Sequence, residues 1–406
     1  MASFKIGFLP LVDAALPIIA HEAGFAQKLG LSIEMVRDPS WATVRDRLIY
    51  GQTDAAHLLA PLALATSMGL GEVTMPLAAP FMLGLNGNAI AASARVSTLI
   101  AESGVKFGDI MGMGRLVAEA AKTFAAQGRK LRVAVVHRYS SHNYMLRYWL
   151  AACGCDPDRD VEIIIVPPPF IAAALAHGEI DLSCVGEPWS SVAVERAGGV
   201  IIASTSQIWS RGVEKLLAFR TALLDARRAE VEALLRALHE AGRLIEDHSH
   251  IDDVAAILAQ PAYIDQPKEL IARALRNRLV LAPGAPETPV GDFLILHQEA
   301  ANFPWRSQAM WLYSQMVRWD HATLDPRGFE NAASVFRPDI YRSALKGTDA
   351  ILPGASAKVE GAIQTPTGAA SVGGRLILGP DSFFDGRAFD PDRAMDYLNE
   401  QMQQYS

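Results

Sequence analysis

The stretch that decides the fold is IDLSCVGEPWSSVAVERAGGVIIAS, residues 180–204. Its apolar start predicts a strand over residues 180–185, because short apolar runs bounded by turn residues are typical of buried strands. A helix is predicted from Trp189 to Gly198, and a second strand over residues 200–204. A strand, a helix and a strand in this order indicate an α/β protein with a mostly parallel sheet.

The same alternation continues on both sides of this stretch. Strands are predicted over residues 31–36, 54–58, 131–136 and 161–166, and helices over residues 14–29, 41–50, 60–68 and 141–153. Extended runs at residues 88–93 and 215–219 separate two groups of such units. The sequence therefore predicts two doubly wound lobes joined by two crossing strands. Lobe 1 is expected to comprise residues 1–90 and 216–406, with a C-terminal wrap, and lobe 2 residues 91–215.

Composition and charge exclude some classes of function. The 406 residues are 50% hydrophobic and 20% charged, as in ordinary globular proteins, and their net charge of −7 disfavours direct binding of nucleic acid. The sequence contains no apolar run of the roughly 20 residues that a bilayer span needs, so no membrane partner is expected. Three cysteines without a pairing pattern, and a start without an export signal, favour a cytoplasmic location.

Six short motifs resemble the nitrate and bicarbonate solute-binding proteins of ABC importers. They are FLPLVD (8–13), SWATVRD (40–46), DAAH (54–57), YWLAA (148–152), VGEPW (185–189) and FRPD (336–339). The resemblance extends over nearly the whole chain. It implies the type II periplasmic-binding-protein fold, in which two doubly wound lobes close over a cleft by hinge motion.

Within this family, the importer receptors carry an export signal and a lipid anchor, whereas this sequence passes directly from Met1 into a strand-like run. The sequence therefore resembles most closely the cytoplasmic NasS-type nitrate/nitrite sensor. That resemblance implies a protein that binds nitrate or nitrite between its lobes and then releases a NasT-type antiterminator, an RNA-binding response regulator of nitrate assimilation. The alternative is the substrate-binding receptor of a nitrate or bicarbonate ABC importer.

The resemblance also implies five ligand-binding residues, which are Trp41, Asn88, His142, Gly186 and Lys215. One position departs from the family, because a glutamine in its Asn-Gly-Gln-Ala-Ile run is replaced here by Asn88, which is one methylene shorter. The family's bicarbonate-binding members carry an acidic residue in place of Lys215 and recruit calcium. The lysine therefore favours nitrate or nitrite, and neither a metal nor a cofactor is expected.

These residue types suit a small monovalent oxyanion, which accepts hydrogen bonds and donates none. Lys215 would supply a positive charge and His142 and Asn88 would supply neutral donors, while Gly186 lets its backbone N–H approach closely. Trp41 would offer an indole N–H or a flat wall. From the sequence, Lys215→Ala is expected to abolish anion binding and to leave the thermal melt of the ligand-free protein nearly unaltered.

An enzyme of the same superfamily is a further alternative. The thiamine-pyrimidine synthase of this superfamily carries a cysteine-rich iron motif, and no such run occurs among the three cysteines here, Cys153, Cys155 and Cys184. The sequence also lacks the spacing of a nucleophile elbow or a metal hydrolase. We therefore expect a binding protein and not an enzyme.

Overall fold

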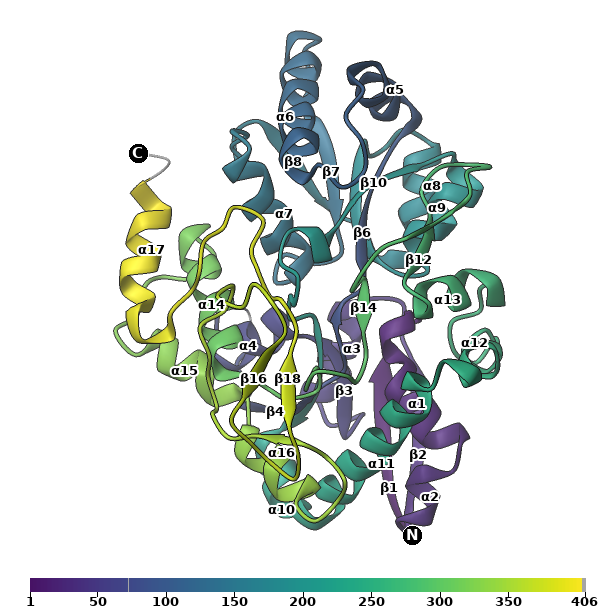
Figure 1. The fold of residues 1–406 in the computed structure, drawn as a ribbon, viewed down its shortest axis with the longest axis vertical. Coiled ribbons are helices and arrows are strands. Elements are labelled where there is room, and N and C mark those ends of the chain that lie inside the picture. The colour runs from purple at the N-terminus through teal and green to yellow at the C-terminus, as the bar shows by residue number, and fades with distance from the viewer. Residues whose placement is uncertain (72, 404–406) are drawn as a thin grey trace.

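The computed structural model describes residues 1–71 and 73–403 and contains two five-stranded sheets, one above the other in Figure 1. The first sheet has the strand order β2-β1-β3-β11-β4 and the second the order β10-β6-β9-β7-β8. The strands of the first sheet are β1 (Ala2–Phe8), β2 (Leu31–Arg37), β3 (Ala55–Leu59), β4 (Leu77–Met82) and β11 (Lys215–Arg220). Those of the second are β6 (Asn88–Ala92), β7 (Leu131–Val135), β8 (Val161–Ile165), β9 (Leu182–Gly186) and β10 (Val200–Ser204).

Helices cover both sheets, as the β-α alternation predicts. Around the first sheet lie α1 (Ala15–Glu22), α2 (Phe25–Lys28), α3 (Trp41–Ile49), α4 (Ala60–Ser67), α10 (Thr221–Ala226), α11 (Arg228–Glu246) and α16 (Pro338–Leu345). Around the second lie α5 (Ala94–Ser103), α6 (Ile110–Ala126), α7 (Ser141–Ala152), α8 (Ile171–Ala176) and α9 (Trp189–Ala197). The further helices are α12 (Ile251–Leu258), α13 (Lys268–Leu275), α14 (Arg306–Arg318), α15 (Gly328–Val335) and α17 (Ala394–Gln403).

One strand in each sheet runs against the other four, and it is the strand by which the chain crosses between the sheets. In the first sheet β11 is antiparallel to β3 and β4, and in the second β6 is antiparallel to β9 and β10. The remaining pairs are parallel. A strand that arrives from the other lobe enters at the carboxyl ends of its neighbours, so its first residue lies at the edge where α/β sheets bind ligands.

The two crossing segments lie side by side and fix each other. Leu85 and Val213 form an antiparallel bridge, and the Leu83 N–H donates to the Lys215 carbonyl at 2.9 Å. Asn86 has a positive φ of 62°, and its side-chain amide joins the two segments by accepting from the Gly212 N–H and donating to the Ser210 carbonyl. The predicted lobe boundaries at residues 90 and 215 fall within β6 and at the start of β11, and the division itself stays a prediction.

Some elements differ from the expectation. The helix predicted over residues 14–29 is broken at Gly24, which has a φ of 72° between α1 and α2. The C-terminal part contains helices α15, α16 and α17, which the sequence did not indicate. Its short strands are β12 (Arg278–Val280), β13 (Glu287–Pro289), β14 (Leu294–Ile295), β15 (Leu352–Pro353), β16 (Thr367–Ala369), β17 (Ser371–Val372) and β18 (Leu376–Leu378). A further short strand, β5 (Leu85–Asn86), pairs with β14.

One continuous hydrophobic core joins the two lobes and the C-terminal segment. Trp305, Trp311 and Trp319 are all buried in it. In Figure 1 the C-terminal segment, coloured yellow, runs along one side of the molecule. In the part of the chain that the structure describes, no helix combines the length and apolarity that a bilayer crossing requires.

Candidate functional site

The five predicted ligand residues converge where the two sheets face each other. Asn88 and Lys215 are the first residues of the crossing strands β6 and β11, and Gly186 is the last residue of β9. Asn88 pairs with Gly186 in the second sheet, while Lys215 pairs with Leu59 at the end of β3 in the first. The sheet topology therefore brings residues from distant parts of the chain together at the facing ends of the two sheets.

The N-termini of two helices lie beside the same ends of the sheets. Trp41 begins α3 after Ser40, whose hydroxyl accepts from the Thr43 N–H at 3.2 Å. His142 lies in the first turn of α7, which Ser140 caps in the same way. Serine is a preferred N-cap because its oxygen satisfies a free backbone N–H. The positive end of each helix dipole therefore lies beside the site, which favours negative charge there.

A carboxylate that the sequence did not single out lies at the centre of these residues. Glu214 is 2% exposed, and its Oε1 atom lies 3.0 Å from Lys215 Nζ and 3.4 Å from His142 Nδ1. Its Oε2 atom accepts from Asn88 Nδ2 at 2.5 Å. Three of the five predicted ligand residues thus face one side-chain carboxylate, which bridges the two lobes.

Lys215 also has a second buried partner. Its Nζ atom lies 2.8 Å from Asp13 Oδ2 in the short helix η1 (Val12–Ala14), and Asp13 Oδ1 lies 2.9 Å from His57 Nε2. The Trp41 ring covers this network, with Lys215 Nζ 5.6 Å from its centre and the His57 ring 5.2 Å away. Lys215 and His57 are both fully buried, so water screens these interactions little.

Burial and pairing together set the charges of the cluster. Burial opposes the ionised form of Asp13, but Lys215 and His57 outweigh it and hold the pKa of that carboxyl well below its usual range. Burial also opposes the charge on Lys215, yet Asp13 and Glu214 raise its pKa. Burial, with help from Lys215, lowers the pKa of His142 well below its ordinary value. Lys215 and Asp13 are therefore charged at neutral pH, and His142 is neutral.

Several buried polar atoms of the cluster have no hydrogen-bond partner among the described residues. They are Trp41 Nε1, His57 Nδ1, Asn88 Oδ1 and His142 Nδ1. The indole N–H of Trp41 can only donate, and a buried donor without an acceptor is costly. A cation, helix dipoles and an unused indole N–H gathered between two lobes form an arrangement that can hold a small anion.

The sequence missed Asp13, His57 and Glu214. Asp13 and His57 both lie in motifs that carry the resemblance, so their inclusion in those motifs was an available signal. Glu214 gave a weaker signal, because a Glu-Lys pair before an apolar strand is usually solvated. The burial of Lys215 also revises the expected effect of Lys215→Ala, since its removal would leave two buried carboxylates without a cation.

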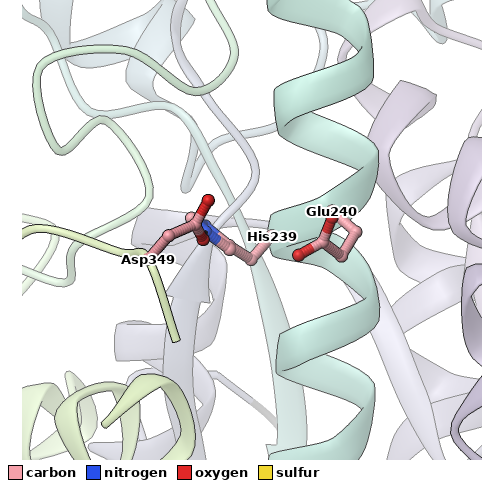
Figure 2. Close-up of side chains that lie close together, drawn as sticks. All are labelled: His239, Glu240 and Asp349. Atoms are coloured by element: carbon pink, nitrogen blue, oxygen red, sulfur yellow. The ribbon is translucent and has the colours of Figure 1, made fainter. Parts of the chain in front are cut away.

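A second cluster of charged residues lies away from the predicted ligand residues. Figure 2 shows His239 and Glu240 on α11 and Asp349 close to His239, with potential ligand atoms within 4.8 Å of one another. His239 Nε2 lies 3.1 Å from Asp349 Oδ1. Arg243 Nη1 lies 2.8 Å from Asp349 and 3.3 Å from Glu240. Because Arg243 already pairs with both carboxylates, we assign this cluster to an ion-pair network rather than to a metal site.

Comparison with known proteins identifies the family. The model of the NMT1-like family matches residues 1–259. The chain belongs to this family. The nitrate/nitrite-binding protein NrtA of Synechococcus elongatus is 30% identical over 404 residues, which cover 97% of this chain and 85% of that protein. The sequence-based prediction of a solute-binding protein family related to ABC importers is therefore confirmed.

Two further relatives are similar to the chain, one in structure and one in sequence. The crystal structure of the periplasmic nitrate-binding protein NrtA from Synechocystis PCC 6803 superposes with a TM-score of 0.86 at 25% identity, covering 99% of this chain and 98% of that one. The nitrate import ATP-binding protein NrtC of Synechocystis sp. is 33% identical over 346 residues. This match covers 85% of the present chain but spans only 50% of NrtC.

These relatives confirm two predictions from the sequence. The chain has the two-lobed periplasmic-binding-protein fold of NrtA, as the β-α alternation and the resemblance predicted. It is a binding protein and not an enzyme, in agreement with the NrtA relatives that match it over almost its whole length.

Proposed function

We propose that the chain binds nitrate or nitrite between its two sheets, with Lys215 as the cation and Trp41, Asn88, His142 and Gly186 around the ion. The observation that carries this proposal is the buried Lys215 ammonium, which faces the same Glu214 carboxylate as the side chains of Asn88 and His142. The relatives that match nearly the whole chain are named nitrate/nitrite-binding proteins, which supports the same ligand.

The position of Lys215 argues against bicarbonate bound with calcium. Its ammonium lies between the carboxylates of Asp13 and Glu214, at 2.8 and 3.0 Å. Oxygen ligands of this kind are what a hard divalent cation prefers. Because the ammonium already occupies the space between them, a divalent cation would have to displace a charged lysine. A singly charged anion that needs no accompanying metal fits this cluster better.

The proposal extends to a regulatory role in the cytoplasm. There the ion would favour the closed form and weaken the hold on a NasT-type antiterminator, which requires different affinities of the partner for the two forms. This role rests on the resemblance of the sequence to the NasS-type sensor. The second candidate is the receptor of an ABC importer, which the similarity to a periplasmic nitrate-binding protein favours.

Isothermal titration with nitrate, nitrite, bicarbonate and sulfate tests the ligand. Nitrate or nitrite is expected to bind at one site per chain and to raise the melting temperature, because a ligand of the folded state stabilises it by mass action. Tight binding of bicarbonate or sulfate, with none of nitrate or nitrite, would contradict the proposal. Fractionation of the native host into cytosol and periplasm, followed by co-purification with and without nitrate, separates the sensor from the importer receptor.

Gly186 provides a test of lobe closure. A Cβ atom there would lie 2.8 Å from Leu11 Cδ2 and 3.2 Å from Asn88 Oδ1. Leu11 follows β1 of the first sheet, whereas Gly186 ends β9 of the second, so the contact with Leu11 joins the two sheets. Overpacking of this kind costs about 1–3 kcal/mol, and Gly186→Ala is therefore expected to weaken nitrate binding about tenfold.

The matched control is Gly368→Ala, where a Cβ atom would meet open space in an exposed strand. It is expected to leave both nitrate affinity and melting temperature unchanged. Wild-type affinity in Gly186→Ala would show that the closed arrangement of these residues is not the one that binds the ion.

A further inference from the structure

The Glu214 carboxylate already uses two of the donors that an anion would need. It lies within hydrogen-bond distance of Lys215 Nζ and Asn88 Nδ2, at 3.0 and 2.5 Å, and 3.4 Å from His142 Nδ1. A carboxylate and a nitrate ion are both planar and present oxygens from one central atom. Both therefore compete for the same donors, and an ion cannot take those donors while Glu214 keeps them.

The charges of the cluster create a second obstacle. Asp13 and an ionised Glu214 each carry one negative charge and Lys215 carries one positive charge, so the cluster has a surplus negative charge. His57 and His142 add none, because burial lowers the pKa of both rings. A further anion in this buried space would meet an uncompensated like charge, which is very costly in a protein interior.

We propose that Glu214 occupies the position of the anion in the ligand-free closed form, and that nitrate or nitrite enters together with one proton, which Glu214 takes up from solvent. This inference rests on the proposed function of the same site. Protonation removes the surplus charge and frees Lys215 and Asn88 to face the ion. The new O–H of Glu214 can then donate to an oxygen of the ion instead of competing with it.

Glu214 is better placed for this proton than the other groups that face it. Burial raises its pKa against the opposing effect of Lys215, so it takes up a proton at a higher pH than an exposed glutamate does. Asp13 is held ionised by Lys215 and His57. The Cys184 thiol stays neutral because burial raises its pKa. His142 is the remaining alternative acceptor, since an anion would oppose the effect of burial on its ring.

Calorimetry on the wild-type protein tests the proton directly. Nitrate is titrated at each pH in two buffers that differ in ionisation enthalpy, from about pH 5.5 to about pH 8.5, a range that brackets the expected change in protonation. The expected result is an uptake of up to one proton per ion at the alkaline end. There the apparent Kd is expected to rise about tenfold per pH unit.

Nitrate binding without proton uptake and without pH dependence would overturn the inference but leave the proposed function intact. No binding at any pH would overturn the proposed function itself.

Two buried glutamates allow a matched comparison. Glu214→Gln removes the titrating group and keeps its shape, so this variant is expected to bind nitrate with little pH dependence and more tightly than wild type at about pH 8. Glu187→Gln is the control, because burial raises the pKa of Glu187 to about 7 although its carboxylate faces Ser191 instead of the cluster. The control is expected to retain the proton uptake. Uptake that persists in Glu214→Gln would assign the proton to His142, and uptake lost only in Glu187→Gln would assign it to Glu187; either result overturns the inference.

Discussion

Lys215→Met is expected to abolish nitrate binding and also to lower the melting temperature of the ligand-free protein. Lys215 is fully buried and carries the positive charge between Asp13 and Glu214. Breaking a buried ion pair by removing one partner destabilises a protein by about 3–5 kcal/mol. Binding is lost because the ion would then face two carboxylates with no cation beside it. Titration with nitrate and a thermal melt measure the two effects separately.

The loss of stability in Lys215→Met is expected to increase with pH. In the wild type, Lys215 and His57 hold the pKa of Asp13 below the ordinary value of 3.8. Asp13 therefore contributes stability above that value, and the contribution is lost as the pH falls through its lowered pKa. In Lys215→Met both carboxylates are disfavoured as anions, so their pKa values rise and they are protonated at acid pH. The difference in stability between the two proteins should be smallest below the lowered pKa of Asp13 and should grow as the pH rises through it.

Two control variants separate the loss of charge from general damage. Lys5→Met removes a lysine that is half exposed and lies 3.3 Å from Glu34 in the same sheet. It is expected to change the free energy of unfolding by less than about 1 kcal/mol and to bind nitrate normally. The triple variant Lys215→Met, Asp13→Asn and Glu214→Gln removes all three charges and should recover much of the stability without recovering binding. Nitrate binding by Lys215→Met itself would remove Lys215 from the site.

The sequence was informative where local chemistry determines structure. Ser40 before Trp41 predicts the start of a helix, and the structure has α3 over Trp41–Ile49 with Ser40 as its cap. The strand and helix between residues 180 and 204 also formed as predicted, with β9 beginning two residues later. The five predicted ligand residues lie in one cluster, because their positions follow from the ends of strands and helices that the shared fold brings together.

The sequence alone does not predict which charged residues become buried when the chain folds. Glu214 and Lys215 stand next to each other as an ordinary charged pair, and only the crossing of β11 into the first sheet buries both. Gly24 divides a periodic apolar stretch whose pattern alone indicates one helix. The stretch 346–374 lies in the part of the chain expected as a C-terminal wrap, yet three paired charges fix it to the rest of the molecule.

These three charges belong to Lys358, Glu360 and Asp381. Lys358 Nζ lies 2.5 Å from Glu360 Oε2 and also pairs with Asp381 Oδ2. Glu360 and Asp381 are both almost fully buried, and Ser307 on α14 donates to Glu360 Oε1 at 2.6 Å. The backbone of Glu360 exchanges hydrogen bonds with Phe389 in both directions. One lysine therefore holds two stretches of the C-terminal segment together and against α14.

The same segment reaches the second lobe. The Tyr148 hydroxyl on α7 donates to the Asp385 carboxylate, with oxygens at 2.8 and 2.9 Å, and the Phe383 ring stacks on Trp209 at 4.8 Å between centres. Trp209 precedes the crossing strand β11, and α7 carries His142. A segment anchored beside the first lobe thus supports two parts of the second lobe that lead to the site.

Lys358→Met is expected to destabilise the folded protein by about 3–5 kcal/mol, because it leaves Glu360 and Asp381 as buried carboxylates without their cation. Hydrogen exchange should increase first in residues 352–389, where the segment is anchored, before it increases in β1 or β7. The matched control on the same segment is Arg393→Met, whose exposed pair with Asp396 should contribute less than about 1 kcal/mol. Adding Glu360→Gln and Asp381→Asn to Lys358→Met should restore much of the stability, since no buried charge then remains unpaired. Equal protection of the segment in Lys358→Met and wild type would show that apolar packing around Phe383 holds it, and not the buried charges.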